Sequence, residues 1–155
     1  MEFSGKKVTV VGTGISGIGA VGLLNAVGAE VVLYDGNEKL KIEDIEKKLG
    51  TYKAEIVLGE LTKELTDSSD LLVISPGVPI DSPVVKAFEA AGVPVWGEVE
   101  LAYAFDKGKV LAITGTNGKT TTTALVGQIV GAYHKDTFVV GNIGNPYTTE
   151  VLKSN

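Results

Sequence analysis

The stretch "VVGTGISGIG", Val10 to Gly19, decides the fold expected for this chain. It continues a β-branched run that starts at Lys7 and is typical of a buried strand. Gly12, Gly14 and Gly17 spell G-x-G-x-x-G between this strand and a run of small and apolar residues typical of a helix. A strand, a glycine turn and a helix in this order predict a phosphate-binding loop, because the start of a helix offers N–H groups and a partial positive charge.

Each glycine of this loop has an expected task. Gly12 permits a tight turn, Gly14 lets a phosphate approach the backbone, and Gly17 lets helix and strand pack closely. Asp35 ends the next predicted strand about 20 residues later, where a dinucleotide enzyme would bind ribose hydroxyls. A uridine or adenosine ligand would use the same loop, and a turn without ligand, with Asp35 as a cap, stays an alternative. The pattern therefore predicts a nucleotide and does not identify NAD.

Outward from this loop, predicted strands and helices alternate, so we expect an α/β, Rossmann-like domain with a mostly parallel sheet over residues 1–106. The helix predicted near residue 83 has start and stop signals in the expected order. Ser82 is a suitable N-cap, Pro83 occupies the first helical position, and Gly92 follows the C-terminal end. "DKGK" at 106–109 reads as a linker. The predicted strands are 7–12, 30–35, 54–59, 70–77 and 93–97, and the predicted helices are 17–26, 42–49, 82–91 and 98–105.

A second glycine loop lies in "ITGTNGKTTTT", Ile113 to Thr123. We expect a strand at 110–114 before it, a helix from Lys119 to about Gly131 after it, and a further strand in "TFVVGNIG". A strict Walker A motif needs glycine where Ile113 stands, so the general pattern is not met. The groups that bind phosphate in a P-loop are nevertheless present, because Lys119 can reach phosphates and the Thr120 hydroxyl can ligate Mg²⁺. Residues 107–155 thus read as the incomplete start of an ATP-binding domain.

Composition excludes several classes of protein. The net charge of −5 argues against non-specific nucleic-acid binding, and the absence of cysteine excludes disulfides and thiol nucleophiles and fits a cytoplasmic protein. All 14 basic residues are lysines, so a bound phosphate must rely on backbone N–H groups, lysine and a metal ion. No apolar run approaches the roughly 20 residues that span a bilayer, so we expect no membrane insertion.

Six short motifs occur in order: "GTGISG", "YDG", "SPGVP", "GEVEL", "ITGTNGKTTT" and "GNIG". Together they resemble the N-terminal part of the Mur ligase family, in its D-glutamate-adding branch, over the whole chain. The combination is specific although each motif alone is not. Members that add L-alanine usually have histidine at the position of Asn117, and members that add a diamino acid, like folate-adding relatives, lack this Rossmann-like first domain.

The resemblance implies that the first domain binds the UDP part of UDP-N-acetylmuramoyl-L-alanine. It places the uridine diphosphate region against Gly14, Ile15 and Ser16, and the uracil against Asp35 and Gly36. The family often has threonine where Gly36 stands, so this residue offers only its backbone. The remaining residues that the resemblance assigns to this substrate are Ser75 and Gly77 of "SPG" and Asn142 of "GNIG".

The resemblance also implies ATP and Mg²⁺ at the second loop, with Lys119 as the catalytic residue and Thr120 on the metal. Phosphoryl transfer to the substrate carboxylate would give an acyl phosphate, which the amine of D-glutamate then attacks. The family's further metal ligands and its amino-acid domain would lie after Asn155, so we expect this chain by itself to be inactive. The residues assigned to ATP are Thr116, Asn117, Gly118, Lys119, Thr120 and Thr121.

Three other readings stay open: an L-alanine-adding ligase, an NAD-binding Rossmann protein, and a non-catalytic nucleotide-binding module. His134 beyond a helix end reads as solvated, and Trp96 as core or interface packing. The helix dipole explains the acidic residues Glu98 and Glu100, and the lysines at 47–48 belong to a solvated helix face.

Overall fold

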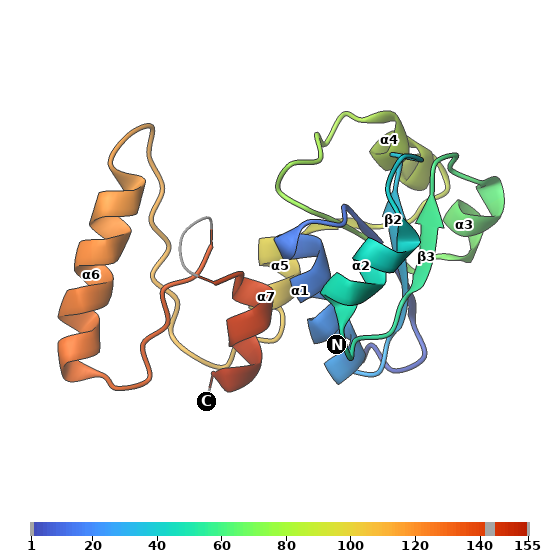
Figure 1. The fold of residues 1–155 in the computed structure, drawn as a ribbon. Helices are drawn as coiled ribbons and strands as arrows, with labels where there is room; N and C mark the ends of the chain where they lie inside the picture. Colours follow the sequence, from blue (N-terminus) through green and yellow to red (C-terminus); the bar gives the residue numbers. More distant parts are fainter. Residues whose placement is uncertain (1, 142–144, 155) are drawn as a thin grey trace.

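The computed structural model, which describes residues 2–141 and 145–154, is built around a five-stranded parallel sheet (Figure 1). The order of its strands is β3-β2-β1-β4-β5, so the chain starts in the middle and winds outward in both directions. This confirms the α/β, Rossmann-like fold with a parallel sheet. The strands are β1 (Lys7–Val11), β2 (Glu30–Asp35), β3 (Glu55–Leu58), β4 (Leu71–Ile74) and β5 (Val95–Gly97).

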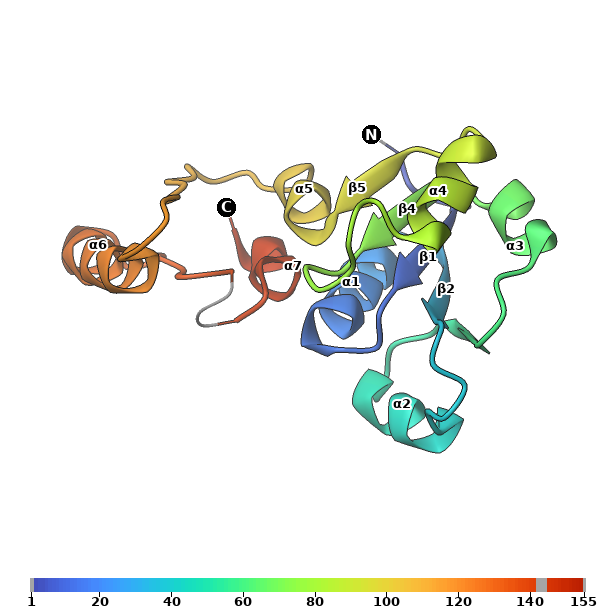
Figure 2. The same ribbon diagram turned by 90° about the horizontal axis from the view of Figure 1, so that it is seen from above.

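Both faces of the sheet are covered, because successive strand residues point to opposite sides. Val8 and Val10 face a core shared with α1 (Ile15–Ala26) and α2 (Ile42–Leu49), whereas Leu72 and Ile74 face a second core. The second core is closed by α3 (Lys63–Ser68) and α4 (Pro83–Ala90), which lie on the other side of the sheet from α1 in Figure 2. The runs of β-branched residues are therefore continuous rather than alternating with polar ones.

The helices follow local signals with some exceptions. Pro83 opens α4 as expected, and Phe88 on its inner face is fully buried, which stabilises the fold by about 2–3 kcal/mol. Ser82 occupies the N-cap position as predicted. Its hydroxyl makes no capping hydrogen bond, however, so the side chain does not satisfy an N–H of the first turn. In α5 (Glu98–Tyr103), Leu101 and Ala102 are buried, whereas Val99 on the same short helix is exposed.

The two strands expected around the second glycine loop do not form in the described residues. Residues 110–114 run as coil, and Leu111 is exposed. After residue 137 only an isolated bridge joins Val140 to Asn145. A β-branched run needs a neighbouring strand to satisfy its backbone, and the described part of the chain offers none there.

The C-terminal third contributes α6 (Lys119–Tyr133), α7 (Tyr147–Glu150) and a short 3₁₀ helix, Val151–Lys153. No residue of α6 is buried, and both Figure 1 and Figure 2 show it apart from the sheet, with α7 between. By contrast α7 packs on α1 and α5, and Tyr147 and Val151 join the first core. The segment after the second loop thus returns to the Rossmann-like unit.

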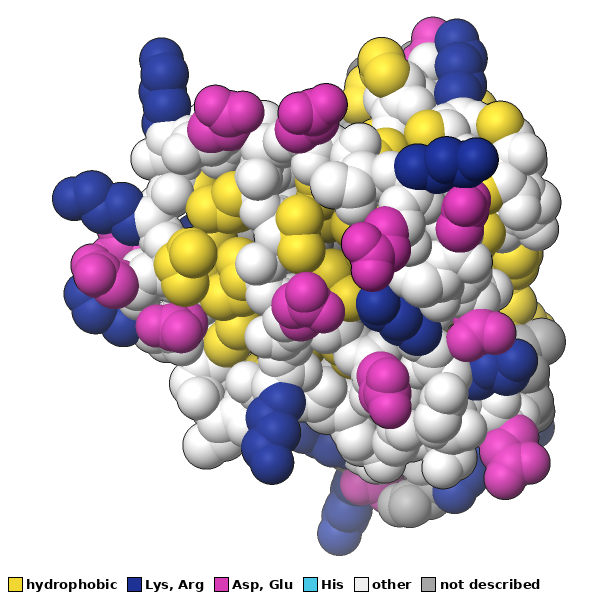
Figure 3. Space-filling model, turned by 90° about the vertical axis from the view of Figure 1, so that its right-hand side faces the viewer, with side chains coloured by type: hydrophobic (Ala, Val, Ile, Leu, Met, Phe, Trp, Pro, Cys, Tyr) yellow, Lys and Arg dark blue, Asp and Glu magenta, His cyan; other side chains and the backbone are white. Residues whose placement is uncertain are grey.

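The face that lies at the right of Figure 1, on the side of α3, carries apolar patches with acidic and lysine side chains scattered among them (Figure 3). Lysines on this face therefore form no continuous basic surface among the residues that the structure describes. Within those residues, no helix has the length and apolar character that crossing a bilayer requires.

Candidate functional site

The first glycine loop joins the end of β1 to the start of α1. Gly12 has φ of 104°, a conformation that side chains disfavour, and its N–H donates to the carbonyl of Tyr34 at 2.9 Å. A Cβ on Gly17 would lie 1.9 Å from the Gly12 carbonyl oxygen, so only glycine lets α1 approach this turn. A Cβ on Gly14 would meet nothing within 4 Å, so its backbone is open to a ligand.

This loop lies at the point where the winding of the sheet reverses. The chain leaves β1 for α1 on one face and leaves β4 toward α4 on the other. Open α/β sheets bind ligands at the carboxyl ends of such strands, and we call this region the crevice. Ser75, directly after β4, donates its N–H to Val11 at 3.2 Å. Its Oγ is buried beside Gly12 and has no hydrogen-bond partner among the described residues. A buried hydroxyl without partner is costly, and this hydroxyl keeps a donor for which the described residues provide no acceptor.

Asp35 is held against the same loop from the end of β2. Its Oδ2 accepts hydrogen bonds from the Thr13 hydroxyl at 3.0 Å and the Thr13 N–H at 3.3 Å, and its Oδ1 accepts from the N–H of Asn37 at 3.1 Å. Two carboxylate oxygens can accept about four hydrogen bonds, so capacity for a ligand N–H or O–H remains. The structure therefore brings the predicted residues Asp35 and Ser75 to one loop.

The first turn of α1 projects into solvent. Ile15 is 80% exposed, and Ser16 beside it is half-buried. Gly36 follows Asp35 directly, and Gly77 is exposed two residues after Ser75.

A hollow of about 440 Å³ opens beside Gly14 and the first turns of α1. Its walls include Ile15 from α1, Lys48 from α2, and Tyr52 and Thr149 from the segments beyond α2 and within α7. Lys48 Nζ donates to the carbonyl of Thr13 at 3.4 Å. The sequence pattern placed Lys48 on a solvated helix face, and nothing local distinguished it from Lys47.

The α7 segment is fastened beside the loop by buried polar contacts. Glu98 is only 5% exposed, and its Oε1 accepts from the Thr148 hydroxyl at 3.1 Å and the Thr148 N–H at 3.4 Å. The Tyr147 hydroxyl donates to Asp106, and burial together with this hydrogen bond raises the pKa of Tyr147. Gly19 of α1 allows the approach, since a Cβ there would lie 2.7 Å from the Thr148 hydroxyl. The helix dipole alone therefore does not account for Glu98.

The second glycine loop has its expected helix but no sheet around it. Gly118 has φ of 75° and precedes α6, whose first residues are Lys119, Thr120 and Thr121. Lys119 Nζ donates to the carbonyls of Gly115 and Thr116, so its ammonium folds back over its own loop. Thr116 and Asn117 of this loop are exposed, and the structure does not bring them to the first glycine loop. Asn142 lies outside the described residues.

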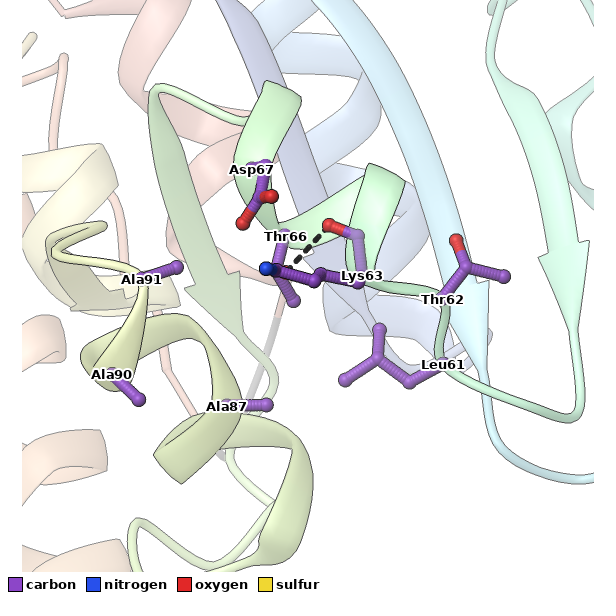
Figure 4. Close-up of a pocket in the computed structure, with 8 residues that line it drawn as sticks. All are labelled: Leu61, Thr62, Lys63, Thr66, Asp67, Ala87, Ala90 and Ala91. Atoms are coloured by element: carbon purple, nitrogen blue, oxygen red, sulfur yellow. Dashed lines mark hydrogen bonds between the residues drawn. The ribbon is translucent and has the colours of Figure 1, made fainter.

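A second hollow of about 480 Å³ lies between α3 and α4, on the opposite side of the sheet from α1 (Figure 4). The small side chains of Ala87 in α4 and of Ala91 directly after it face Lys63, Thr66 and Asp67 from α3. The Thr66 hydroxyl donates to the Lys63 carbonyl at 2.8 Å, so it serves its own helix. Across residues 2–141 and 145–154, no group of histidine and carboxylate side chains could hold a metal ion.

The family model described as "Mur ligase MurD-like, N-terminal domain" matches residues 6–97. These residues include all five strands, α1 to α4, the first glycine loop and the residues that follow β4. The chain belongs to this family. The match agrees with the resemblance carried by the glycine loop and the "SPG" motif, and it ends where β5 ends.

Curated relatives match almost the whole MurD-like chain. The UDP-N-acetylmuramoylalanine–D-glutamate ligase of Lachnospira eligens is 68% identical over 154 residues, which are 99% of this chain and 34% of the relative. The protein of the same name from Lachnoclostridium phytofermentans is 57% identical over 152 residues. The chain thus spans about a third of the length of these relatives.

Among solved structures, a pseudomurein peptide ligase type C from Methanothermus fervidus is similar with a TM-score of 0.56 and 24% sequence identity. The similarity covers 94% of this MurD-like chain and 31% of that protein. At this level of identity it supports the fold alone.

Proposed function

We propose that the chain forms the substrate-binding part of an ATP-dependent ligase that adds D-glutamate to UDP-N-acetylmuramoyl-L-alanine during the cytoplasmic synthesis of peptidoglycan precursors. The observation that carries the proposal is the match of the MurD-like family to residues 6–97, whose glycine loop opens into the crevice of the sheet. Relatives with 68% and 57% identity bear the name of that ligase, which supports the D-glutamate-adding branch.

In this proposal the crevice binds the UDP part of the substrate. The N–H groups at the start of α1, from Ile15 and Ser16, face an anion across the open backbone of Gly14. Asp35 accepts from the uracil N3–H, because Thr13 and Asn37 hold its carboxylate in a fixed orientation. Gly36 adds a backbone contact to the uracil.

The polar groups after β4 complete the proposed substrate site. The buried Ser75 hydroxyl, which has no partner in the described part of the chain, donates to a phosphate or sugar oxygen. Gly77 presents its backbone two residues later, and the family resemblance assigns Asn142, which lies outside the described residues, to the diphosphate or sugar.

Residues 107–155 are proposed as the start of the central ATP-binding domain. What supports this is that Gly118 turns the backbone at φ of 75° and that Lys119 and hydroxyl residues follow it at the start of α6. Thr116, Asn117, Gly118 and Thr121 would bind ATP through N–H and hydroxyl groups. Mg²⁺ on the Thr120 hydroxyl would neutralise phosphate charge.

The chemistry assigned to this chain is mainly electrostatic positioning. Lys119 holds the transferred phosphoryl group and balances its charge as it moves to the substrate carboxylate. The resulting acyl phosphate makes that carboxyl carbon electrophilic, so the amine of D-glutamate can attack it and phosphate leaves. The crevice residues keep the substrate's UDP end fixed throughout, so its carboxylate is presented in one orientation.

A thermal-shift comparison of UDP-N-acetylmuramoyl-L-alanine with NADH tests the proposal. We expect stabilisation by the UDP substrate and by UDP, and none by NADH, because ligand binding to the native state raises its stability. The variant Asp35→Asn keeps a side chain of equal size but presents an N–H to the uracil, so it should lose most of this stabilisation. Stabilisation by NADH alone would refute the ligase assignment.

A further inference from the structure

Lys48 contacts the backbone of the first glycine loop, although it is an exposed residue of α2. Its Nζ donates to the carbonyl oxygen of Thr13, between Gly12 and Gly14, at 3.4 Å. This is longer than the usual N–H···O distance of about 2.9 Å, so the contact is weak. A lysine ammonium carries three donors, and the described residues give this one no other partner.

The loop is short of positive charge for the ligand it is proposed to bind. Asp35 accepts hydrogen bonds from the N–H and the hydroxyl of Thr13, so an acidic side chain lies beside the loop. The start of α1 supplies only about half a positive charge. The chain has no arginine, and among the residues that line the hollow beside Gly14, Lys48 is the one that is charged.

We propose that Lys48 is the cationic contact for the diphosphate of a nucleoside diphosphate bound at the first glycine loop. This rests on the proposed function of that loop. On binding, the ammonium exchanges the Thr13 carbonyl for a phosphate oxygen. A charge-assisted hydrogen bond of this kind is shorter, about 2.7–2.9 Å, and stronger than a bond to a neutral carbonyl.

Lys47 provides a matched control from the neighbouring position. It is on the same helix turn, carries the same charge, and pairs with Asp44 at 3.5 Å rather than with the loop. Lys47→Met and Lys48→Met therefore make the same change in net charge and side-chain volume. Lys48→Arg restores the charge at the loop.

The experiment measures UDP and uridine affinities of the 155-residue chain and of these three variants by ¹H–¹⁵N NMR titration. Lys48→Met should weaken UDP binding roughly tenfold, because a hydrogen bond to a charged group is lost. Uridine binding should change by less than about twofold, since uridine has no phosphate. Lys47→Met should match the wild type for both ligands, and Lys48→Arg should recover most of the UDP affinity.

Two outcomes would overturn the inference while leaving the site itself intact. One is wild-type UDP affinity in Lys48→Met. The other is an equal loss of UDP and uridine affinity in that variant, which would mean that Lys48 only ties α2 to the loop. Failure of the wild type to bind UDP would instead refute the proposed function of the loop, and this inference with it.

Discussion

Replacing Gly17 with alanine should destabilise the fold through a backbone collision. The added Cβ would lie 1.9 Å from the carbonyl oxygen of Gly12 and 3.0 Å from its carbonyl carbon. Gly12 is itself held at φ of 104° and bonded to β2 through Tyr34, so the turn cannot rotate away as a side chain could. Overpacking a core costs about 1–3 kcal/mol, and we expect about 3 kcal/mol here because α1 must move as a unit.

This loss is large enough to measure in two ways. For a chain of this length each kcal/mol lowers the Tm by roughly 3 °C, so Gly17→Ala should melt roughly 9 °C below the wild type. Urea unfolding followed by far-UV circular dichroism and by Trp96 fluorescence gives the free energy directly. Coincident transitions and an unchanged m-value would show that the native state, rather than the unfolded ensemble, is altered.

Gly14→Ala is the matched control in the same loop. Its Cβ would meet nothing within 4 Å, and Gly14 has φ of −78°, which alanine adopts readily. We expect its free energy of unfolding to stay within about 0.5 kcal/mol of the wild type. UDP binding should nevertheless fall, because the methyl group stands where a phosphate would approach. A loss below about 1 kcal/mol in Gly17→Ala would refute the packing argument.

Two further substitutions test contacts outside the loop. Thr148→Val keeps the shape of the side chain but leaves the buried Glu98 carboxylate without its 3.1 Å hydroxyl donor, so urea unfolding should show a loss of about 2 kcal/mol; unchanged stability would contradict this. Asp70 accepts from the Lys7 N–H and from Lys6, and these hydrogen bonds lower its pKa below the usual 3.8. Its ionised form therefore stabilises the fold above that pH, and the stability is lost as the pH falls through the lowered pKa. Asp70→Asn should make the free energy of unfolding fall less steeply below about pH 4 than it does in the wild type. The same pH dependence in both proteins would show that the Asp70 contact does not cause this fall.

The sheet could be predicted from the sequence because its determinants are local. Each strand is a short apolar run stopped by glycine or proline, and β2 and α2 have the predicted bounds. The amphipathic spacing of α2 puts Ile42, Ile45 and Leu49 on one helical face; Ile45 and Leu49 are buried, whereas Ile42, at the start of the helix, is exposed. These signals act within a few residues, so no knowledge of distant partners was needed.

The errors arise where structure depends on partners far along the chain. The run at 110–114 has strand propensity, but it lies beside no strand that the structure describes, and it stays coil. The contact of Thr148 with Glu98 joins residues 50 apart, and the four-residue α7, rich in threonine, carries no helix signal. Lys48 was missed for the same reason, since its proximity to Thr13 follows from how α2 packs.

The two glycine loops therefore differ in what supports them. The first is held by β1, β2 and β4, and its Asp35 carboxylate is oriented by hydrogen bonds from Thr13 and Asn37 before any ligand arrives. At the second, the Lys119 ammonium bonds to its own loop, and no residue of α6 is buried. A preorganised site loses less freedom on binding, and a lysine bonded to its own backbone must first exchange that partner. In this chain the first loop is consequently the better placed of the two to bind a nucleotide, and UDP and ATP titrated separately should show the stronger response with UDP.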